Sequence, residues 1–562
     1  NKPHIFYDSD VAKWIEAAAY ILQTREDPEL EAKIDGLVDL IVEHQDPSGY
    51  FNVWFTVIEP DKRFQLRDKH ELYCAGHLME AAVAYDQARG KDALLRAMCR
   101  YADHIEQVFK IERKAAFVSC GHPEVELALI RLYEHTGERR YLDLCRFFLD
   151  ERGRHPEEEV IHGNRRYAQD HLPVREQTTA EGHAVRACYL YCGMADLARV
   201  DQDEKMLAAC KALFENIVTR RMYVTGGIGS TPVGEAFTID YDLPNETAYT
   251  ETCAAIALAL FARRMLRLDP DRIYADTAEL ALYNGFLSGV SLDGRSFFYE
   301  NPLSIDLSLR RRHVSTGNPQ PERLPITQRA AVFSCSCCPP NVSRVVAAVA
   351  DQLYTLDDAR LYVHQYMDST AEMEGMTLRQ QTHYPADGEI SVQLTGAKGR
   401  SLYLRIPGWC PGHRLTVDGA AYDAPLERGY ARIPVEGDEI KIGLHLDMPV
   451  TLMEASTHVH ADAGKAALQR GPIVYCLEGL DNGEDLDDVQ VDANLQPELL
   501  WLGRDLPPHV RCLGWRRKGY DSKTLYRPYD GTLVPQTLTF IPYYAFANRG
   551  ETDMRVFVGV RR

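Results

Sequence analysis

The segment 334–341, with the sequence SCSCCPPN, contains the residues whose types most directly suggest chemistry. It places Cys335, Cys337 and Cys338 within four residues, directly before a Pro-Pro pair. Because prolines block helical continuation upstream and are favoured in the first turn of a new helix, we expect these cysteines in an irregular turn at a helix N-terminus. The helix dipole there favours thiolate over thiol. We interpret the segment as a reactive or metal-binding cluster; a disulfide or cysteines packed in a core are the alternatives.

A metal ion at this cluster needs further ligands, and Glu251 and Cys253 are the candidates. Side chains two residues apart on a helix point about 200° away from each other, so both can bind one ion only at a helix start or a turn. They follow the turn residues Pro244 and Asn245 and precede an apolar helical segment at 254–266, which is such a position. One carboxylate with three thiolates forms a tetrahedral donor set suited to zinc. The sequence therefore predicts Zn2+ as a cofactor.

A glycine-rich loop at 223–230 (YVTGGIGS) precedes Glu235. A phosphate-binding loop is disfavoured, because the Lys–Ser/Thr pattern of such loops is missing. We interpret the glycines as bending the backbone so that Glu235 projects into a pocket. Its aromatic and apolar neighbours Phe237, Tyr241 and Leu243 would raise the pKa of the carboxyl into the range of a general acid. A solvated surface carboxylate is the alternative.

Three histidines share one kind of placement, since His77, His122 and His183 each follow a glycine near the start of a predicted helix. In a ring of helix pairs such loops gather at one mouth, where the three imidazoles would line a polar pocket for a sugar. The alternative for each is a histidine that caps a helix or is packed in the core.

The elements that must position these residues are helical up to residue 354. Eleven segments carry apolar residues at three- and four-residue spacing: 11–22, 31–42, 71–88, 92–108, 125–135, 141–149, 183–198, 204–218, 251–266, 273–287 and 342–354. This many helical hairpins predicts a solenoid or a closed toroid of helix pairs. The absence of a fixed repeat disfavours the solenoid.

After residue 354 the pattern changes to short alternating segments separated by turn residues. A first group lies at 361–366, 389–394, 401–406, 414–417, 429–434 and 439–445, and a second at 465–469, 471–477, 537–544 and 554–560. An acidic loop is expected at 482–488. Closely spaced short strands are typical of β-sandwiches. We predict a multidomain α+β chain, with a helical catalytic domain at 1–355, a β-sandwich at 356–456 and a C-terminal β-sandwich at 457–562.

Composition excludes several classes of function. The 562 residues include 63 Lys and Arg against 82 Asp and Glu, a formal charge of −19, and so acidic a surface makes nucleic acid an unexpected partner. No apolar run approaches the roughly 20 residues that cross a bilayer, so no membrane partner is expected. The first residues lack the features of a signal peptide, and the 14 cysteines are scattered like reduced core residues. Both observations favour a cytoplasmic protein.

The motifs together resemble glycoside hydrolase family 127, a family typified by bacterial β-L-arabinofuranosidases and closely related to family 146. The resemblance rests on YVTGGIGS at 223–230, GEAFTIDYDLPN at 234–245, YTETCAAI at 249–256, LYNG at 282–285 and CCPPN at 337–341. It implies an (α/α)6 barrel followed by β-sandwich domains, and retention of anomeric configuration. Family members also have a further N-terminal segment that completes the barrel, and we expect the barrel to be incomplete without it.

The resemblance also implies roles for individual residues. The zinc ligands would be Glu251, Cys253, Cys337 and Cys338, with Cys337 as the nucleophile and Glu235 as the general acid/base. The sugar contacts would be His77, His122, His183, Glu279 and Tyr299.

The function expected from this resemblance is a zinc-dependent retaining exo-glycosidase that releases L-arabinofuranose from β-L-arabinofuranosides. The partner would be an oligosaccharide or small glycoside, and a homodimer through the C-terminal β domain is a further candidate. A related glycosidase acting on another pectic sugar is one alternative. A sugar isomerase or epimerase on the same toroid is a second, although such enzymes do not need the cysteine cluster. A non-catalytic protein with structural zinc is a third.

Overall fold

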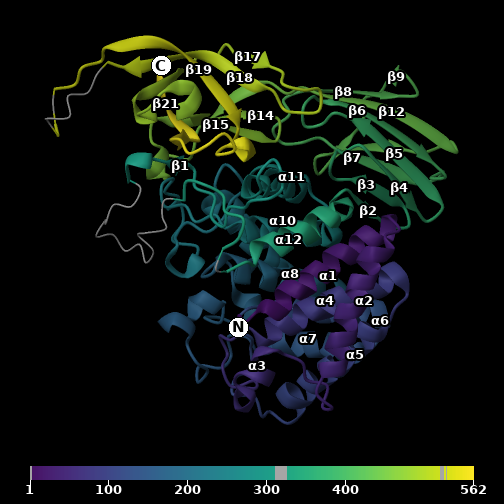
Figure 1. Cartoon of the computed structure of the whole chain (residues 1–562). Coiled ribbons are helices and arrows are strands. Elements are labelled where there is room, and N and C mark those ends of the chain that lie inside the picture. Colours follow the sequence, from purple (N-terminus) through teal and green to yellow (C-terminus); the bar gives the residue numbers. More distant parts are fainter. Residues whose placement is uncertain (1–2, 310–325, 334, 519–524, 527, 562) are drawn as a thin grey trace.

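The computed structural model describes residues 3–309, 326–333, 335–518, 525–526 and 528–561. Helices dominate up to residue 352, and strands dominate from residue 354 onward. Figure 1 shows the helices in the lower part of the molecule and the two β-rich regions above them. The predicted order, a helical region followed by β-rich regions, is confirmed.

Six helices contact one another in a closed ring, in which each packs against the next and the last packs against the first. In ring order they are α1 (Tyr7–Thr24), α4 (Glu71–Arg89), α6 (Val125–Thr136), α8 (Ala184–Asp201), α10 (Thr252–Leu268) and α12 (Cys338–Ala347). Every residue of α8 from Ala184 to Ala198 is buried, and this stretch is rich in Ala and Cys, whose small side chains let neighbouring helices approach closely. Among the described residues, these six helices close the inner ring among themselves.

Five further helices cover this ring from outside: α2 (Pro28–His44), α5 (Ala93–Glu106), α7 (Arg139–Glu151), α9 (Glu204–Asn216) and α11 (Arg272–Leu280). They are amphipathic; α5, for example, buries Leu94, Ala97, Met98, Tyr101 and Ile105 on one face. A short helix α3 (Trp54–Val57) was not predicted.

All eleven predicted helical segments overlap helices of the structure, but the last one was wrong in extent. The prediction covered 342–354, whereas α12 begins at Cys338 and ends at Ala347. The prolines occupy its first turn, where their missing N–H groups leave no hydrogen bond unmade. Tyr354 instead begins strand β2 (Tyr354–Leu356).

The first β-rich region holds two sheets that enclose one hydrophobic core. The five-stranded sheet has the order β10 (Leu426–Glu427), β11 (Tyr430–Pro434), β7 (Ser401–Arg405), β3 (Arg360–Val363) and β2. The six-stranded sheet has the order β4 (Ser369–Met373), β5 (Met376–Thr382), β6 (Glu389–Thr395), β12 (Glu439–Leu446), β8 (His413–Val417) and β9 (Ala420–Ala421). Alternation places Ile440, Ile442 and Leu444 of β12 inward, and the intervening Glu439 and Lys441 outward.

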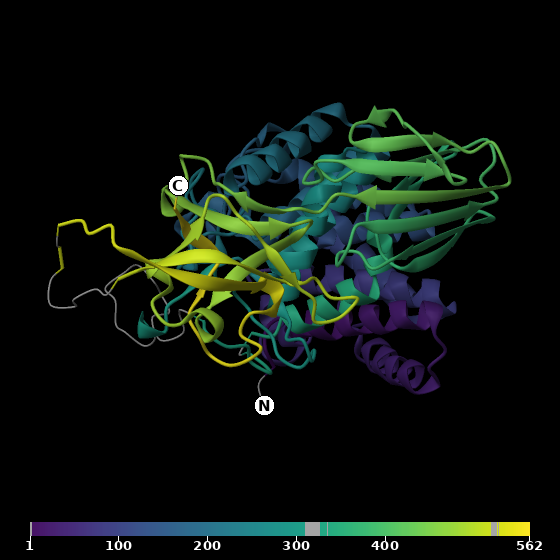
Figure 2. The ribbon, with the colours of Figure 1, turned by 90° about the horizontal axis from the view of Figure 1, so that it is seen from above.

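The second β-rich region is a ten-stranded sheet. Its order is β1 (Ser304–Ile305), β20 (Met554–Arg555), β15 (Ile473–Glu478), β19 (Leu533–Pro542), β18 (His509–Arg517), β16 (Val489–Asp492), β21 (Phe557–Arg561), β14 (Lys465–Arg470) and β13 (Val450–Met453), with β17 (Glu498–Leu500) on β18. Strand β1 comes from the helical part of the chain, so this sheet is joined to that part by backbone hydrogen bonds. Figure 2 shows the two β-rich regions side by side over the helices.

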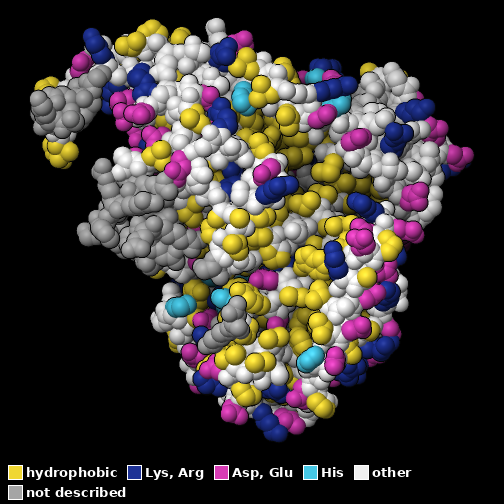
Figure 3. All heavy atoms as spheres, viewed as in Figure 1, with side chains coloured by type: hydrophobic (Ala, Val, Ile, Leu, Met, Phe, Trp, Pro, Cys, Tyr) yellow, Lys and Arg dark blue, Asp and Glu magenta, His cyan; other side chains and the backbone are white. Residues whose placement is uncertain are grey.

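Acidic and basic side chains are interspersed over the face of the molecule in Figure 3, and hydrophobic side chains gather near its middle. Among the described residues, no helix is both long enough and apolar enough to span a bilayer.

Candidate active site

The N-termini of the six ring helices converge on one pocket of about 170 Å3. The residues that cap α1, α4, α8, α10 and α12 all line it: Phe6, His70, His183, Glu251 and Cys337. Helix α6 contributes His122, which lies two residues before the cap of that helix. Because the positive dipole ends of all six helices face this mouth, the pocket favours anionic groups.

The predicted cluster of one glutamate and three cysteines lies at the wall of this pocket, which three of its four members line: Glu251, Cys253 and Cys337. The ligand atoms of Glu251, Cys253, Cys337 and Cys338 all lie within 4.8 Å of one another. The three Sγ–Sγ distances are 3.3 Å (Cys253–Cys338), 3.8 Å (Cys337–Cys338) and 3.9 Å (Cys253–Cys337). Glu251 Oε1 lies 3.8 Å from Cys337 Sγ and 3.9 Å from Cys338 Sγ.

These distances fit a tetrahedral metal site. With zinc–sulfur bonds of about 2.3 Å, tetrahedral thiolates are separated by about 3.8 Å, close to the distances found here. The electrostatics agree, because hydrogen bonds from the other two cysteines lower the pKa of Cys253 to about 6. Burial, and then the nearby Cys337, raise the pKa of Glu251 well above its ordinary value. A buried group of mutually repelling acids is what a divalent cation neutralises.

Glu235 faces the same pocket and is held by His183. His183 Nδ1 accepts a hydrogen bond from the Val185 N–H at 3.2 Å, so the imidazole proton lies on Nε2, which is 2.8 Å from Glu235 Oε2. Burial opposes ionisation of Glu235, but the hydrogen bonds from His183 and Tyr249 outweigh it and lower the pKa. The prediction of a raised pKa was wrong, because it considered the apolar neighbours and not the imidazole donor.

Two further predicted residues also line the pocket. Tyr299 places its hydroxyl 3.5 Å from Cys337 Sγ, and burial raises the pKa of this phenol well above its ordinary value. His122 packs at 5.8 Å from His183, measured between ring centroids. Burial, and then the charge of Arg186, lower the pKa of His122 well below its ordinary value, so its imidazole is neutral.

Two predicted sugar contacts lie elsewhere. His77 is completely buried two turns inside α4, where its Nδ1 lies 3.0 Å from Glu124 Oε1. Glu279 is buried between the helices and the first β-rich region, where its carboxylate accepts hydrogen bonds from Arg405 and from Trp409 Nε1. Neither residue is among those that line the pocket, and their roles as sugar contacts stay predictions that the resemblance implies.

Sequence reasoning missed several pocket residues, among them His70, Tyr73, Tyr167 and Arg186. His70 directly precedes the predicted helix 71–88, in the capping position that His183 also takes, and that signal could have found it. Tyr73 accepts a hydrogen bond from the buried Lys13 Nζ at 2.9 Å, a pairing that sequence spacing does not reveal.

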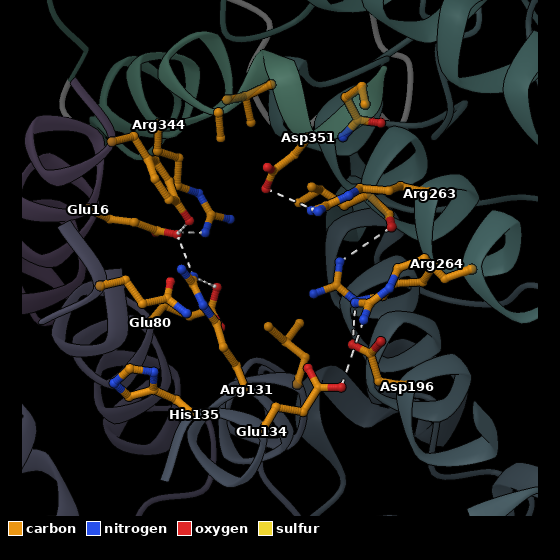
Figure 4. Close-up of a pocket in the computed structure, with 18 of the residues that line it drawn as sticks. Glu16, Glu80, Arg131, Glu134, His135, Asp196, Arg263, Arg264, Arg344 and Asp351 are labelled. Carbon is orange, nitrogen blue, oxygen red and sulfur yellow. Dashed lines mark hydrogen bonds and ion pairs between the residues drawn. The ribbon is translucent and has the colours of Figure 1, made fainter. Parts of the chain in front are cut away.

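A larger cavity of about 360 Å3 opens at the other ends of the same helices. Figure 4 shows its charged side chains pointing inward and pairing around the wall, among them Arg131 with Glu80 at 2.8 Å and Arg264 with Asp196 at 2.6 Å. Helix C-termini favour such cations. This cavity lacks the cysteine cluster, so the chemistry points to the smaller pocket. Tyr189 lines both and separates them.

Comparison with known proteins agrees with this site. Three family models cover the chain: the GH127 catalytic domain of beta-L-arabinofuranosidase at 2–351, the GH127 middle domain at 360–448 and the family 127 C-terminal domain at 450–559. The chain is 40% identical over 597 aligned residues to the non-reducing end beta-L-arabinofuranosidase of Bifidobacterium longum, an alignment that covers 98% of this chain and 89% of that protein.

Solved structures give the same answer. A GH127 beta-L-arabinofuranosidase from Geobacillus stearothermophilus T6 superposes with a TM-score of 0.94 and 43% identity, covering 100% of this chain and 92% of that one. A second GH127 beta-arabinofuranosidase superposes with a TM-score of 0.85 and 34% identity, covering 99% of this chain and 88% of that one. With three domain matches in sequence order and a shared structure over the whole chain, this protein belongs to glycoside hydrolase family 127 and is a glycoside hydrolase.

Proposed function

We propose that the protein is a zinc-dependent retaining exo-glycosidase that releases L-arabinofuranose from the non-reducing end of β-L-arabinofuranosides. The observation that carries this proposal is the cluster of Glu251 with three cysteines, of which Glu251, Cys253 and Cys337 line the same pocket as Glu235. A pocket of about 170 Å3 suits a single sugar unit, which favours exo action. The names of the relatives supply the sugar, since each is described as a beta-arabinofuranosidase.

The residues divide the reaction between them. Cys337 Sγ would attack the anomeric carbon while Glu235 gives a proton to the departing glycosidic oxygen, so that a C–S bond forms as the C–O bond breaks. Glu235 would then take a proton from a water molecule that displaces the sulfur and restores the original configuration. A zinc ion held by Glu251, Cys253, Cys337 and Cys338 would keep the thiol ionised at neutral pH.

His183 would control the proton on Glu235. Its Nε2–H holds the carboxylate ionised in the free site, which is the form that the second step needs. The first step needs the protonated form, so we infer that substrate binding weakens this hydrogen bond. Tyr299, beside Cys337 Sγ, would orient the thiolate or the sugar.

We propose that the ring of helices is an (α/α)6 barrel and that both β-rich regions are β-sandwiches. The two sheets around one core support this for the first region. The domain limits would be 1–355, 356–456 and 457–562. We also propose a cytoplasmic location and a homodimer through the C-terminal domain.

The test is hydrolysis of p-nitrophenyl β-L-arabinofuranoside, with zinc content measured alongside. Glu235→Gln should lower kcat about 10²- to 10⁴-fold. Cys337→Ser should abolish turnover, while Cys410→Ser, a cysteine of the first β-rich region, should leave it unchanged. Full activity of Cys337→Ser would defeat the mechanism. If the protein hydrolyses only the glycoside of another pectic sugar, that sugar takes the place of L-arabinofuranose in the proposal. An isomerised product without hydrolysis would favour the isomerase alternative.

A further inference from the structure

A second group of metal-ligating atoms lies beside the cysteine cluster. One ligand atom from each of His183, Glu235 and Glu251 lies within 4.8 Å of the other two. We propose that a second divalent cation of the zinc class binds these three residues, shares Glu251 with the cysteine cluster, and thereby inhibits the enzyme. The inhibition rests on the proposed glycosidase activity, and the count of two ions rests on the proposed zinc at the cysteine cluster.

The two oxygens of Glu251 support a shared role. Oε1 faces the thiols, at 3.8 Å from Cys337 Sγ and 3.9 Å from Cys338 Sγ. Oε2 is buried, and among the described residues it has no hydrogen-bond partner. A buried carboxylate oxygen without a partner is costly, and a cation on the Glu235 side would satisfy it. One carboxylate would thus bridge two ions.

The other two ligands already lie close together. His183 Nε2 is 2.8 Å from Glu235 Oε2, and the cation would replace the proton between them. That proton would move to Nδ1, and the imidazole would lose the hydrogen bond that Nδ1 accepts from Val185 N–H. This loss makes the second site weaker than the thiolate site. The side chain of Glu235 is 34% exposed, so an ion can enter from the mouth of the pocket.

The acidic side chains around this group favour a cation, whereas the helix dipoles at the mouth of the pocket oppose one. Glu235, Glu251 and Cys337 all line the pocket. The guanidinium of Arg186 lines it too, but Arg186 Nη1 is occupied by Asp68 Oδ1 at 3.1 Å and by Gly121 O at 2.9 Å. Arg186 therefore neutralises the acidic groups Glu235, Glu251 and Cys337 only in part. A cation on Glu235 would occupy the oxygens that must transfer the proton, so inhibition would compete with substrate.

The binding test titrates the holoenzyme, prepared with one zinc per chain, with Zn2+ or Cd2+ in equilibrium dialysis. We expect the metal content to rise from one to two per chain. His183→Gln should weaken the second equivalent at least about tenfold and leave the first in place. Glu235→Gln should also weaken the second equivalent and leave the first in place. This second variant keeps the test decisive if the histidine variant misfolds. The matched control is His122→Gln, which changes a buried histidine of the same pocket and should keep both equivalents.

Saturation at one metal per chain in the unchanged protein would overturn the proposal, as would loss of the second equivalent in His122→Gln to the same extent as in His183→Gln. In parallel, added Zn2+ should raise the KM for the aryl glycoside without lowering kcat, and a chelator that removes only the weaker ion should reverse this. A second equivalent that binds without changing KM would overturn the inhibitory role. Because dialysis needs no turnover, failure of the proposed glycosidase activity would leave the binding result readable.

Discussion

Replacing Glu279 by Gln separates a structural role from a sugar-binding one. The carboxylate is buried and accepts hydrogen bonds from Arg405, Tyr384 and Trp409, all of the first β-rich region. It therefore joins that region to α11 of the helical part. Resemblance assigned Glu279 to the sugar, but its position predicts a loss of stability with no loss of substrate affinity.

The size of the loss of stability in Glu279→Gln depends on the hydrogen bonds and ion pairs that remain. Removing one member of a buried ion pair costs about 3–5 kcal/mol. Asp276 Oδ1 stays paired with Arg405 Nη1 at 2.6 Å, and Gln keeps one acceptor oxygen, so we expect the lower end, about 3 kcal/mol. At about 2–4 °C per kcal/mol for a domain of 150–250 residues, the midpoint should fall by about 6–12 °C.

The assay is differential scanning calorimetry, read at the first transition because a multidomain chain is not expected to unfold in two states. KM and kcat for the aryl glycoside, measured well below that transition, should stay within about twofold of the unchanged protein. Glu439→Gln, on the exposed face of β12, is the control and should shift neither quantity. An unchanged midpoint with a KM raised about tenfold or more would refute the structural reasoning and restore Glu279 to the sugar site.

Two further predictions concern Glu71 and Gly182, both in the helical region. Glu71 is buried, and burial raises its pKa from 4.5 to about 7. The proton is therefore held more tightly in the folded state, so this group stabilises below about pH 4.5 and loses up to about 3 kcal/mol as the pH rises through 7. Glu71→Gln should flatten the fall of the melting temperature between these pH values, and an unchanged slope would contradict the assignment. Gly182 has φ +72°, and an added Cβ would lie 2.0 Å from Arg166 O, so Gly182→Ala should displace His183 and lower both the melting temperature and kcat. A variant that keeps both would show that the loop can relax.

The helices were predictable because apolar spacing records burial directly. The strands were harder to predict from the sequence. Strand β4 (Ser369–Met373) was missed, because its sequence STAEM contains few apolar residues. The cysteine cluster could be predicted because three cysteines before two prolines have few structural explanations. The predicted limits of α12 were wrong because the apolar spacing at 342–354 begins after the prolines, whereas the helix begins at Cys338 and the prolines form part of its first turn.

The histidines show where sequence spacing stops being informative. A glycine before His122 and His183 correctly marked loops at the pocket, but the same pattern before His77 lies inside α4. Gly76 is needed there because an added Cβ would lie 2.7 Å from Glu124 Cγ, which is a packing requirement. Only the three-dimensional contact distinguishes the two uses of glycine. The pKa of Glu235 depends in the same way on His183, a neighbour that is distant in sequence.

The convergence of six helix starts has a consequence for how the protein fails. The pocket groups are spread over several members of the ring: His70 caps α4, His183 caps α8, and the start regions of α10 and α12 hold Glu251 with Cys253 and Cys337 with Cys338. Fraying at the start of any one of these helices displaces its groups from their partners while the remaining helices stay folded. Catalytic competence therefore reports the integrity of the whole ring, and inactivation on heating should precede the loss of helical signal.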